Sequence, residues 1–211
     1  MSATTRTTAG PDERQRPRPS DAKTFFIWIG LCLLGIPLAG YLGWGVAGHV
    51  DGVMPALIGG ALTGAGIGFA QWLLLRRVLG IGPGWIVATS VGLALGLAVG
   101  ALVVGYETTT TQLAIMGAIQ GAFVGIAQGM LLRKKLSLWH VWMVAMPVFF
   151  SIAWVVTDGV IDSGQRFTVF GASGAVVFAI LSGLLLLAGI RRDRSAADAA
   201  LVLRVTATPP V

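Results

Sequence analysis

The chain has 211 residues, of which 55% are hydrophobic and 11% charged, and its mean hydropathy is +0.81. That is more apolar side chain than one globular core can hide, so the composition excludes an ordinary soluble domain. The formal net charge is +6, but the charges are confined to the tails and short loops, and we expect no nucleic-acid partner.

Six apolar stretches are each long enough to cross a bilayer, which takes about 20 residues of helix. Residues 1–24 precede them; this segment combines Pro, Arg and Thr without apolar periodicity, so we expect a disordered basic tail. None of the six stretches contains Asp, Glu, Lys or Arg, and their continuous Leu, Ala and Gly content does not fit a barrel. They cover residues 25–47, 53–75, 85–105, 112–132, 138–156 and 168–190. We therefore predict an all-α integral membrane protein with six transmembrane helices over residues 25–190, followed by a C-terminal tail over 191–211.

The basic residues predict the orientation of these helices. Fourteen of the fifteen Lys and Arg residues lie in the N-terminal tail, at Arg76 and Arg77, at 133–135, or beyond Ile190. These places fall on one side of the membrane if the helices alternate, as the positive-inside rule expects. We expect both termini to be cytoplasmic, in a multi-pass protein of the plasma or inner membrane.

An internal repeat of 57 residues is the most informative feature of the chain. Ten of the seventeen positions in 60–76 are identical to those in 117–133. Trp28, Trp85 and Trp142 are spaced by 57 and 57, which brings a third copy into register. Each tryptophan stands near the basic start of an odd-numbered helix, where an indole can straddle the headgroup boundary, so we predict three interfacial anchors.

Each repeat contains one helical hairpin that starts and ends on the same side of the membrane. The repeats cover about 25–80, 81–137 and 138–192. Parallel repeats of this kind imply an axis along the membrane normal. We expect three tandem parallel hairpins in a pseudo-threefold bundle.

Glycines recur every fourth residue within the helices, in GxxxG rows. Residues at this spacing share one helix face, and small residues there let two backbones approach closely in lipid. We predict helix packing through these rows, either within the chain or against another protein. The rows contain Gly60, Gly64 and Gly68, then Gly92, Gly96 and Gly100, then Gly117, Gly121 and Gly125.

Gln71 and Gln128 form the candidate polar site. They occupy equivalent places in AQWLLLRR and AQGMLLRK, about one turn inside the basic boundary. Such amides bond to a neighbouring helix or line a small vestibule. Leu185 stands at the third equivalent place, which prevents a closed ring of amides and favours interhelical bonding.

The sequence lacks the residue sets that intramembrane chemistry requires. We find no HExxH, GxSxG or phosphate-loop pattern and no charged residue within the spans, so we expect no enzyme, cofactor, metal site or ion-coupled pump. Glu107, Asp158 and Asp162 lie on the other side, where short loops are acidic because basic residues stay inside.

Two functions remain. The first is a non-enzymatic scaffold or accessory subunit that packs through its glycine-rich faces in the bilayer, against a second copy or a membrane protein partner. The alternative is a small passive channel or the substrate-binding membrane component of a transport system.

Overall fold

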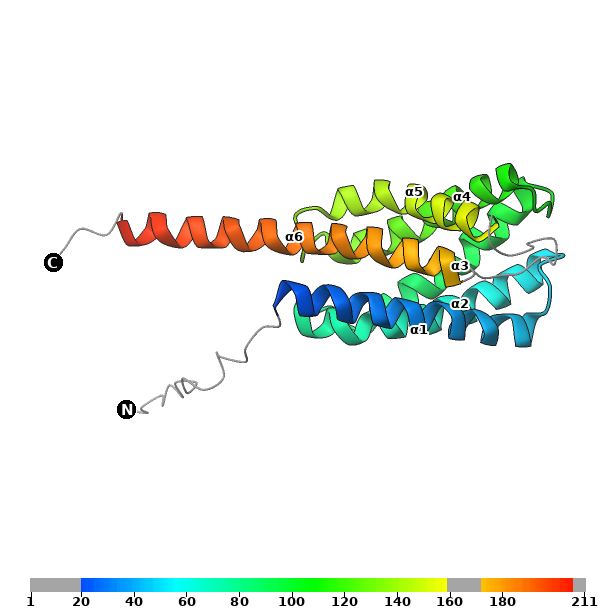
Figure 1. The fold of residues 1–211 in the computed structure, drawn as a ribbon, viewed down its shortest axis with the longest axis horizontal. Helices are drawn as coiled ribbons and strands as arrows, with labels where there is room; N and C mark the ends of the chain where they lie inside the picture. Colours follow the sequence, from blue (N-terminus) through cyan, green and yellow to red (C-terminus); the bar gives the residue numbers. More distant parts are fainter. Residues whose placement is uncertain (1–19, 159–171, 207–211) are drawn as a thin grey trace, which may run out of the picture.

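The computed structural model describes residues 20–158 and 172–206 and contains six long helices in these ranges (Figure 1). Each is long and apolar enough to cross a membrane, which confirms the prediction of six apolar helices. They are α1 (Asp21–Ala47), α2 (Val53–Val78), α3 (Gly84–Val103), α4 (Thr110–Leu132), α5 (Trp139–Asp158) and α6 (Ala172–Thr206).

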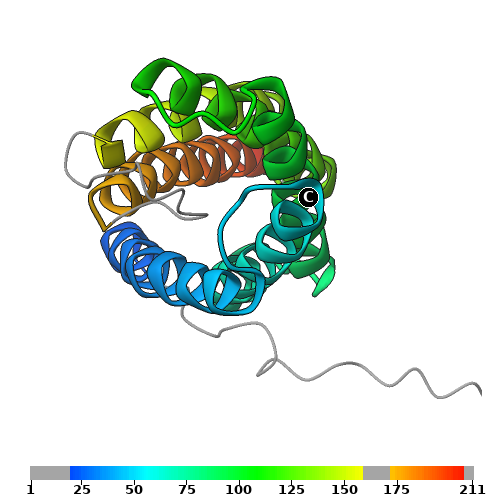
Figure 2. The same ribbon diagram turned by 90° about the vertical axis from the view of Figure 1, so that its right-hand side faces the viewer.

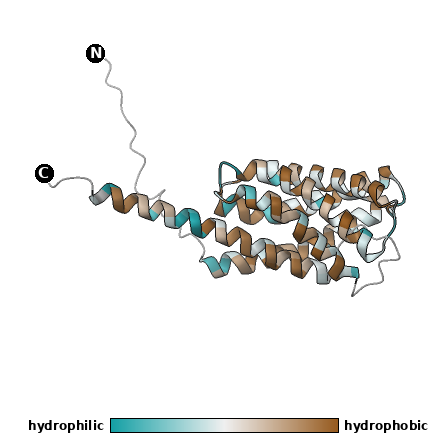
Figure 3. Cartoon of the chain, turned by 90° about the horizontal axis from the view of Figure 1, so that it is seen from above, coloured by the Kyte–Doolittle hydropathy of each residue, from teal (hydrophilic) through white to brown (hydrophobic). Residues whose placement is uncertain are grey.

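The helices form a ring in chain order. Each packs against the next one along the chain, and α6 packs against α1 as well as α5, which closes the ring (Figure 2). Figure 3 shows hydrophobic residues along much of the helices, with hydrophilic residues mainly toward the helix ends and on part of α6. Every helix exposes large apolar side chains, as expected for a helical membrane protein. Examples are Phe26, Phe69, Val87, Ile126, Val144 and Leu184.

We call the end of the ring where α1 begins and α2 and α4 end the basic end. Arg76 and Arg77 close α2 there, and residues 133–135 follow α4. Helix α1 begins at Asp21, four residues before the predicted span, because the Ser20 side chain caps it by accepting from the Lys23 backbone N–H.

Helix α6 differs most from the sequence expectation. Its predicted start at residue 168 lies outside the described residues, but its end is well described, and the helix continues past Ile190 to Thr206. The continuation contains Ala, Arg and Leu but neither Gly nor Pro, so nothing in it interrupts the helix. We call residues 191–206 the arm; it extends beyond the other helices in line with α6 (Figure 1).

The three glycine rows lie against neighbouring helices of the same chain. A Cβ added at Gly64 would stand 2.7 Å from the Ser90 Cα, and one at Gly96 would stand 2.7 Å from the Gln120 Cα. The row on α2 faces α3, the row on α3 faces α4, and the row on α4 faces α5. Contacts this short leave no room for a side chain, so these rows set the spacing between successive helices.

Candidate functional site

Three tryptophans meet inside the ring, toward its basic end. Trp28, Trp85 and Trp142 stand near the starts of α1, α3 and α5, and they are 0%, 0% and 1% exposed. The Trp142 ring lies edge-on to the other two, with centroids 6.3 Å from Trp28 and 6.2 Å from Trp85. The prediction of interfacial anchors is therefore wrong: the indoles point into the protein and not toward headgroups. The 57-residue spacing predicts that the three tryptophans lie at the same depth in the bundle. It does not predict which side of each helix faces the interior.

Each indole N–H donates to a polar side chain on an even-numbered helix. Trp85 Nε1 donates to Gln71 Oε1 and Trp142 Nε1 donates to Gln128 Oε1, both at 3.1 Å. Trp28 Nε1 donates to Ser182 Oγ at 3.0 Å. Burying an indole N–H without a partner is costly, and these three bonds satisfy all three donors.

Gln71 and Gln128 meet in the same layer, on α2 and α4. The Gln128 Nε2 group donates to Thr89 Oγ1 at 2.9 Å and lies 3.5 Å from Gln71 Oε1. The Gln71 Nε2 group lies 4.0 Å from the Cys32 sulfur. Both amides are therefore engaged between helices, at 1% and 2% exposure. We call Trp28, Cys32, Gln71, Trp85, Thr89, Gln128, Trp142 and Ser182 the polar layer.

Ser182 and Gln120 are the polar partners that sequence reasoning missed. Ser182 stands one helical turn from Leu185, the place where a third glutamine would be expected, and takes over as the acceptor for Trp28. Gln120 Oε1 accepts from Trp154 Nε1 at 2.9 Å, farther from the basic end. The sequence contains one indication of each: Ser182 stands where the other two repeats have glycine, and Gln120 stands where the first repeat has the smaller Thr63.

The chemistry of the polar layer is that of structural hydrogen bonding. Its described members carry no carboxylate, amine or imidazole that would act as an acid or a base. The two amides, the three indoles and the Ser182 and Thr89 hydroxyls bond to each other or to the helix backbone. The layer fills the ring here with uncharged side chains, and its hydrogen bonds link residues of all six helices.

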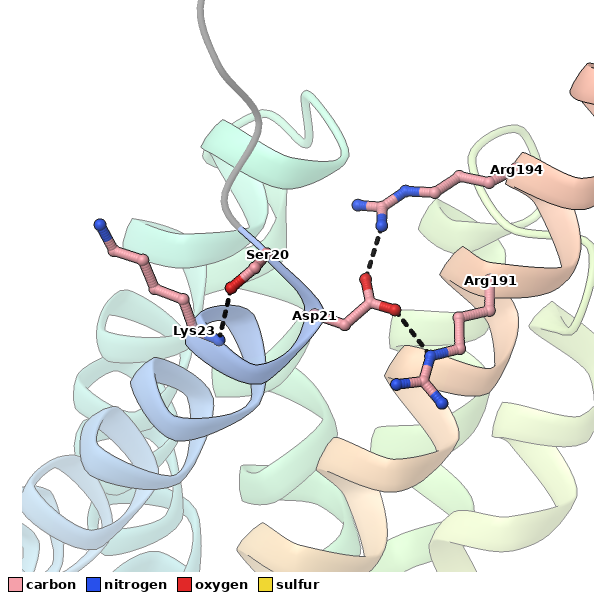
Figure 4. A network of polar contacts seen from close by, with 5 residues as sticks. All are labelled: Ser20, Asp21, Lys23, Arg191 and Arg194. Carbon is pink, nitrogen blue, oxygen red and sulfur yellow. Dashed lines mark hydrogen bonds and ion pairs between the residues drawn. The ribbon is translucent and has the colours of Figure 1, made fainter.

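A carboxylate clamps the first helix to the last at the basic end. Asp21 accepts from Arg191 Nε at 2.7 Å and from Arg194 Nη1 at 2.5 Å (Figure 4). Asp21 is the first residue of α1, where the helix dipole also favours a negative charge. The clamp closes the ring at the contact between α1 and α6.

A cavity of about 560 Å³ opens beside this clamp. Its lining comes from the start of α1, the end of α2, the turn after α4 and the first turns of the arm. Arg77, Lys135 and Arg194 contribute positive charge to it, and Asp193 and Asp198 contribute negative charge.

The opposite end of the ring carries three described carboxylates, Asp51, Glu107 and Asp158. Asp158 accepts from the Thr110 hydroxyl at 2.5 Å, and Glu107 accepts from the Gln112 amide at 2.9 Å. Asp162 lies outside the described residues. Within those ranges, no three His, Cys, Asp or Glu residues gather as metal ligands would.

No protein-family model, curated protein or solved structure matches the chain.

Proposed function

We propose that this protein is a non-enzymatic scaffold or accessory subunit of a membrane complex. In this proposal three tandem hairpins with a 57-residue repeat surround a pseudo-threefold axis, and both termini are cytoplasmic. Two observations support it: the polar side chains inside the ring bond to one another, and the arm beyond Asp198 offers an exposed helix that extends past the ring.

The arm is the observation that carries the proposal. It extends roughly 24 Å beyond Ile190 at 1.5 Å per residue, and it continues a helix that is packed into the ring. Near its tip, Leu201, Val202 and Leu203 are 62%, 61% and 69% exposed. Apolar side chains on a solvent-facing helix are typical of a segment that docks into a groove of a partner.

The sequence suggests that the glycine rows contact a partner protein, but in this proposal they hold the ring together. Since they lie against helices of the same chain, they are not free to bind another protein. They stiffen the ring, and the proposed partner contact moves to the arm.

Native mass spectrometry of the complex, extracted gently from its own membrane, tests the proposal. We expect a stoichiometric second polypeptide on the wild-type chain and its loss from the variant L201E/L203E. The variant S195E/T206E adds the same two negative charges to the same arm at polar positions, and should keep the partner. A wild-type chain that carries no second polypeptide would overturn the proposal, as would an L201E/L203E chain that keeps its partner.

The alternative is a passive channel or a substrate-binding transport component. The cavity at the basic end favours it, because a vestibule of this size would admit a small solute. The polar layer counts against it, since its tightly buried side chains lie across the path. A monomer or homo-oligomer that retains a small molecule in the same experiment would favour this alternative.

A further inference from the structure

The cavity at the basic end has the chemistry of an anion site, and this goes beyond the proposed partner contact. Its positive groups come from segments far apart in the sequence: Arg77 closes α2, Lys135 follows α4 and Arg194 belongs to the arm. The Lys135 ammonium lies close to Gly80, just after α2, at 3.7 Å from where a Cβ on that residue would stand. Val78, Leu79 and Ile190 add an apolar wall.

Two of these charged groups already have partners. Arg194 forms an ion pair with Asp21 at 2.5 Å, and the Asp193 carboxylate accepts from the Ser137 backbone N–H at 3.1 Å and keeps its charge. Within residues 20–158 and 172–206, Arg77 and Lys135 make no ion pair with any carboxylate. Arg76, the neighbour of Arg77, is engaged differently, over the face of Trp72 at 4.6 Å from the ring centroid.

The charges of the lining define the ligand. Arg77, Lys135 and Arg194 carry three positive charges, and Asp193 and Asp198 carry two negative charges. The surplus of one positive charge suits an anion with a single negative charge. Arginine and lysine together favour phosphate oxygens, because one offers a planar fork of donors and the other a compact charge.

A buried hydroxyl lies close to the inner side of this cavity. Ser20 lines the cavity, and Thr24 follows it one turn along α1 on the same face. The Thr24 side chain is 1% exposed, and its hydroxyl has no hydrogen-bond partner among the described residues. Buried hydroxyls are normally bonded, so Thr24 is an exception, but it does not line the cavity and would not contact a bound anion.

We propose that this cavity binds a phosphodiester anion, held by Arg77 and Lys135 with its uncharged portion against the apolar wall. Two sources supply this chemistry: the headgroup of an anionic phospholipid, and a free phosphodiester. Either one would bridge the end of α2 to the turn after α4 and lie against the base of the arm.

The test uses the full chain and two probes. Native mass spectrometry counts phosphatidylglycerol retained from mixed phosphatidylcholine and phosphatidylglycerol vesicles, and calorimetry in neutral detergent measures binding of soluble glycerophosphoglycerol. The variant R77Q/K135Q removes the two positive charges of the cavity that make no ion pair within the described residues. Its control R133Q/K134Q removes two positive charges from the same end, at residues that do not line the cavity.

We expect R77Q/K135Q to weaken binding about tenfold or more, as for the loss of two charge-assisted hydrogen bonds, and the control to change it by less than about twofold. Retention of the lipid alone identifies a headgroup site, and equal binding of the soluble diester identifies a free phosphodiester. The proposal is overturned if neither probe binds the wild-type chain, or if both variants weaken binding equally. Matching thermal midpoints show that both variants are folded.

Discussion

The substitution Gly121→Ala tests whether the glycine rows set the spacing between helices. A Cβ at this position would stand 2.7 Å from the Met146 carbonyl carbon and 2.7 Å from the Pro147 Cα, and it would also overlap the Met146 oxygen. All three atoms belong to the backbone of α5 and cannot rotate away. Carbon atoms need roughly 3.5 Å, so α4 and α5 must separate by roughly 0.8 Å, and overpacking of this kind costs about 1–3 kcal/mol.

The control for this test is Gly45→Ala in α1, where an added Cβ meets nothing within 4 Å. Alanine is favoured over glycine in a helix by about 1 kcal/mol, so Gly45→Ala should be neutral or slightly stabilising. The same gain partly offsets the loss at Gly121. The difference between the two variants therefore isolates the packing cost, about 1–3 kcal/mol.

Reversible unfolding of the purified protein in mixed micelles, followed by tryptophan fluorescence, measures both free energies. Comparing the variants under identical conditions removes the contribution of the detergent. Equal stability of Gly121→Ala and Gly45→Ala would refute the argument that backbone contact at the glycine rows holds the helices together.

Three further substitutions test the contacts inside and at the end of the ring. Gln128→Leu should lower the free energy of unfolding by about 1–3 kcal/mol, because it leaves the Trp142 N–H buried without a partner; an unchanged thermal midpoint would contradict this. Ser182→Ala should likewise destabilise the protein and shift its near-ultraviolet circular dichroism, since Trp28 loses its acceptor; retention of both signals would show that this bond contributes nothing. Asp21→Asn should cost less than about 1 kcal/mol, and the difference from wild type should vanish at high salt, because the clamp is partly exposed; a large salt-independent loss would indicate a buried ion pair.

The sequence predicted the helices well because their signal is local. Runs of about 20 apolar residues without charge leave few alternatives in a membrane, and the helix ends agree to within a few residues except for α6. The end of α6 was missed because the arm is not apolar throughout, and only the lack of Gly and Pro before Pro209 indicates that the helix continues. The start of α1 was displaced by a cap at Ser20, which lies outside the apolar run.

The polar layer was only partly predictable. The matched positions of Gln71 and Gln128 suggested a shared role, and the structure brings them within 3.5 Å of each other. Their bonds to Trp85 and Trp142 depend on which face of each helix points into the ring. The spacing between equivalent residues does not determine how each helix is rotated about its own axis. A tryptophan near a membrane boundary is usually an anchor, so the sequence favours that interpretation, which the burial of all three side chains contradicts. The Asp21 clamp joins residues that are 170 and 173 positions apart, for which no local pattern exists.

The reactivity of Cys32 tests most directly whether the interior of the ring is closed. It is the only cysteine of the chain, it belongs to the polar layer, and it is 1% exposed, so one added cysteine is enough to provide a reference. A charged maleimide is added to both faces of the membrane, and mass spectrometry measures labelling over time, with Ser195→Cys on the exposed arm as the accessible reference in the same molecule. We predict rapid labelling at position 195 and none at Cys32 until the protein is unfolded. Labelling of Cys32 in the folded protein at a rate near that of the reference would contradict the closed interior and favour a conduit.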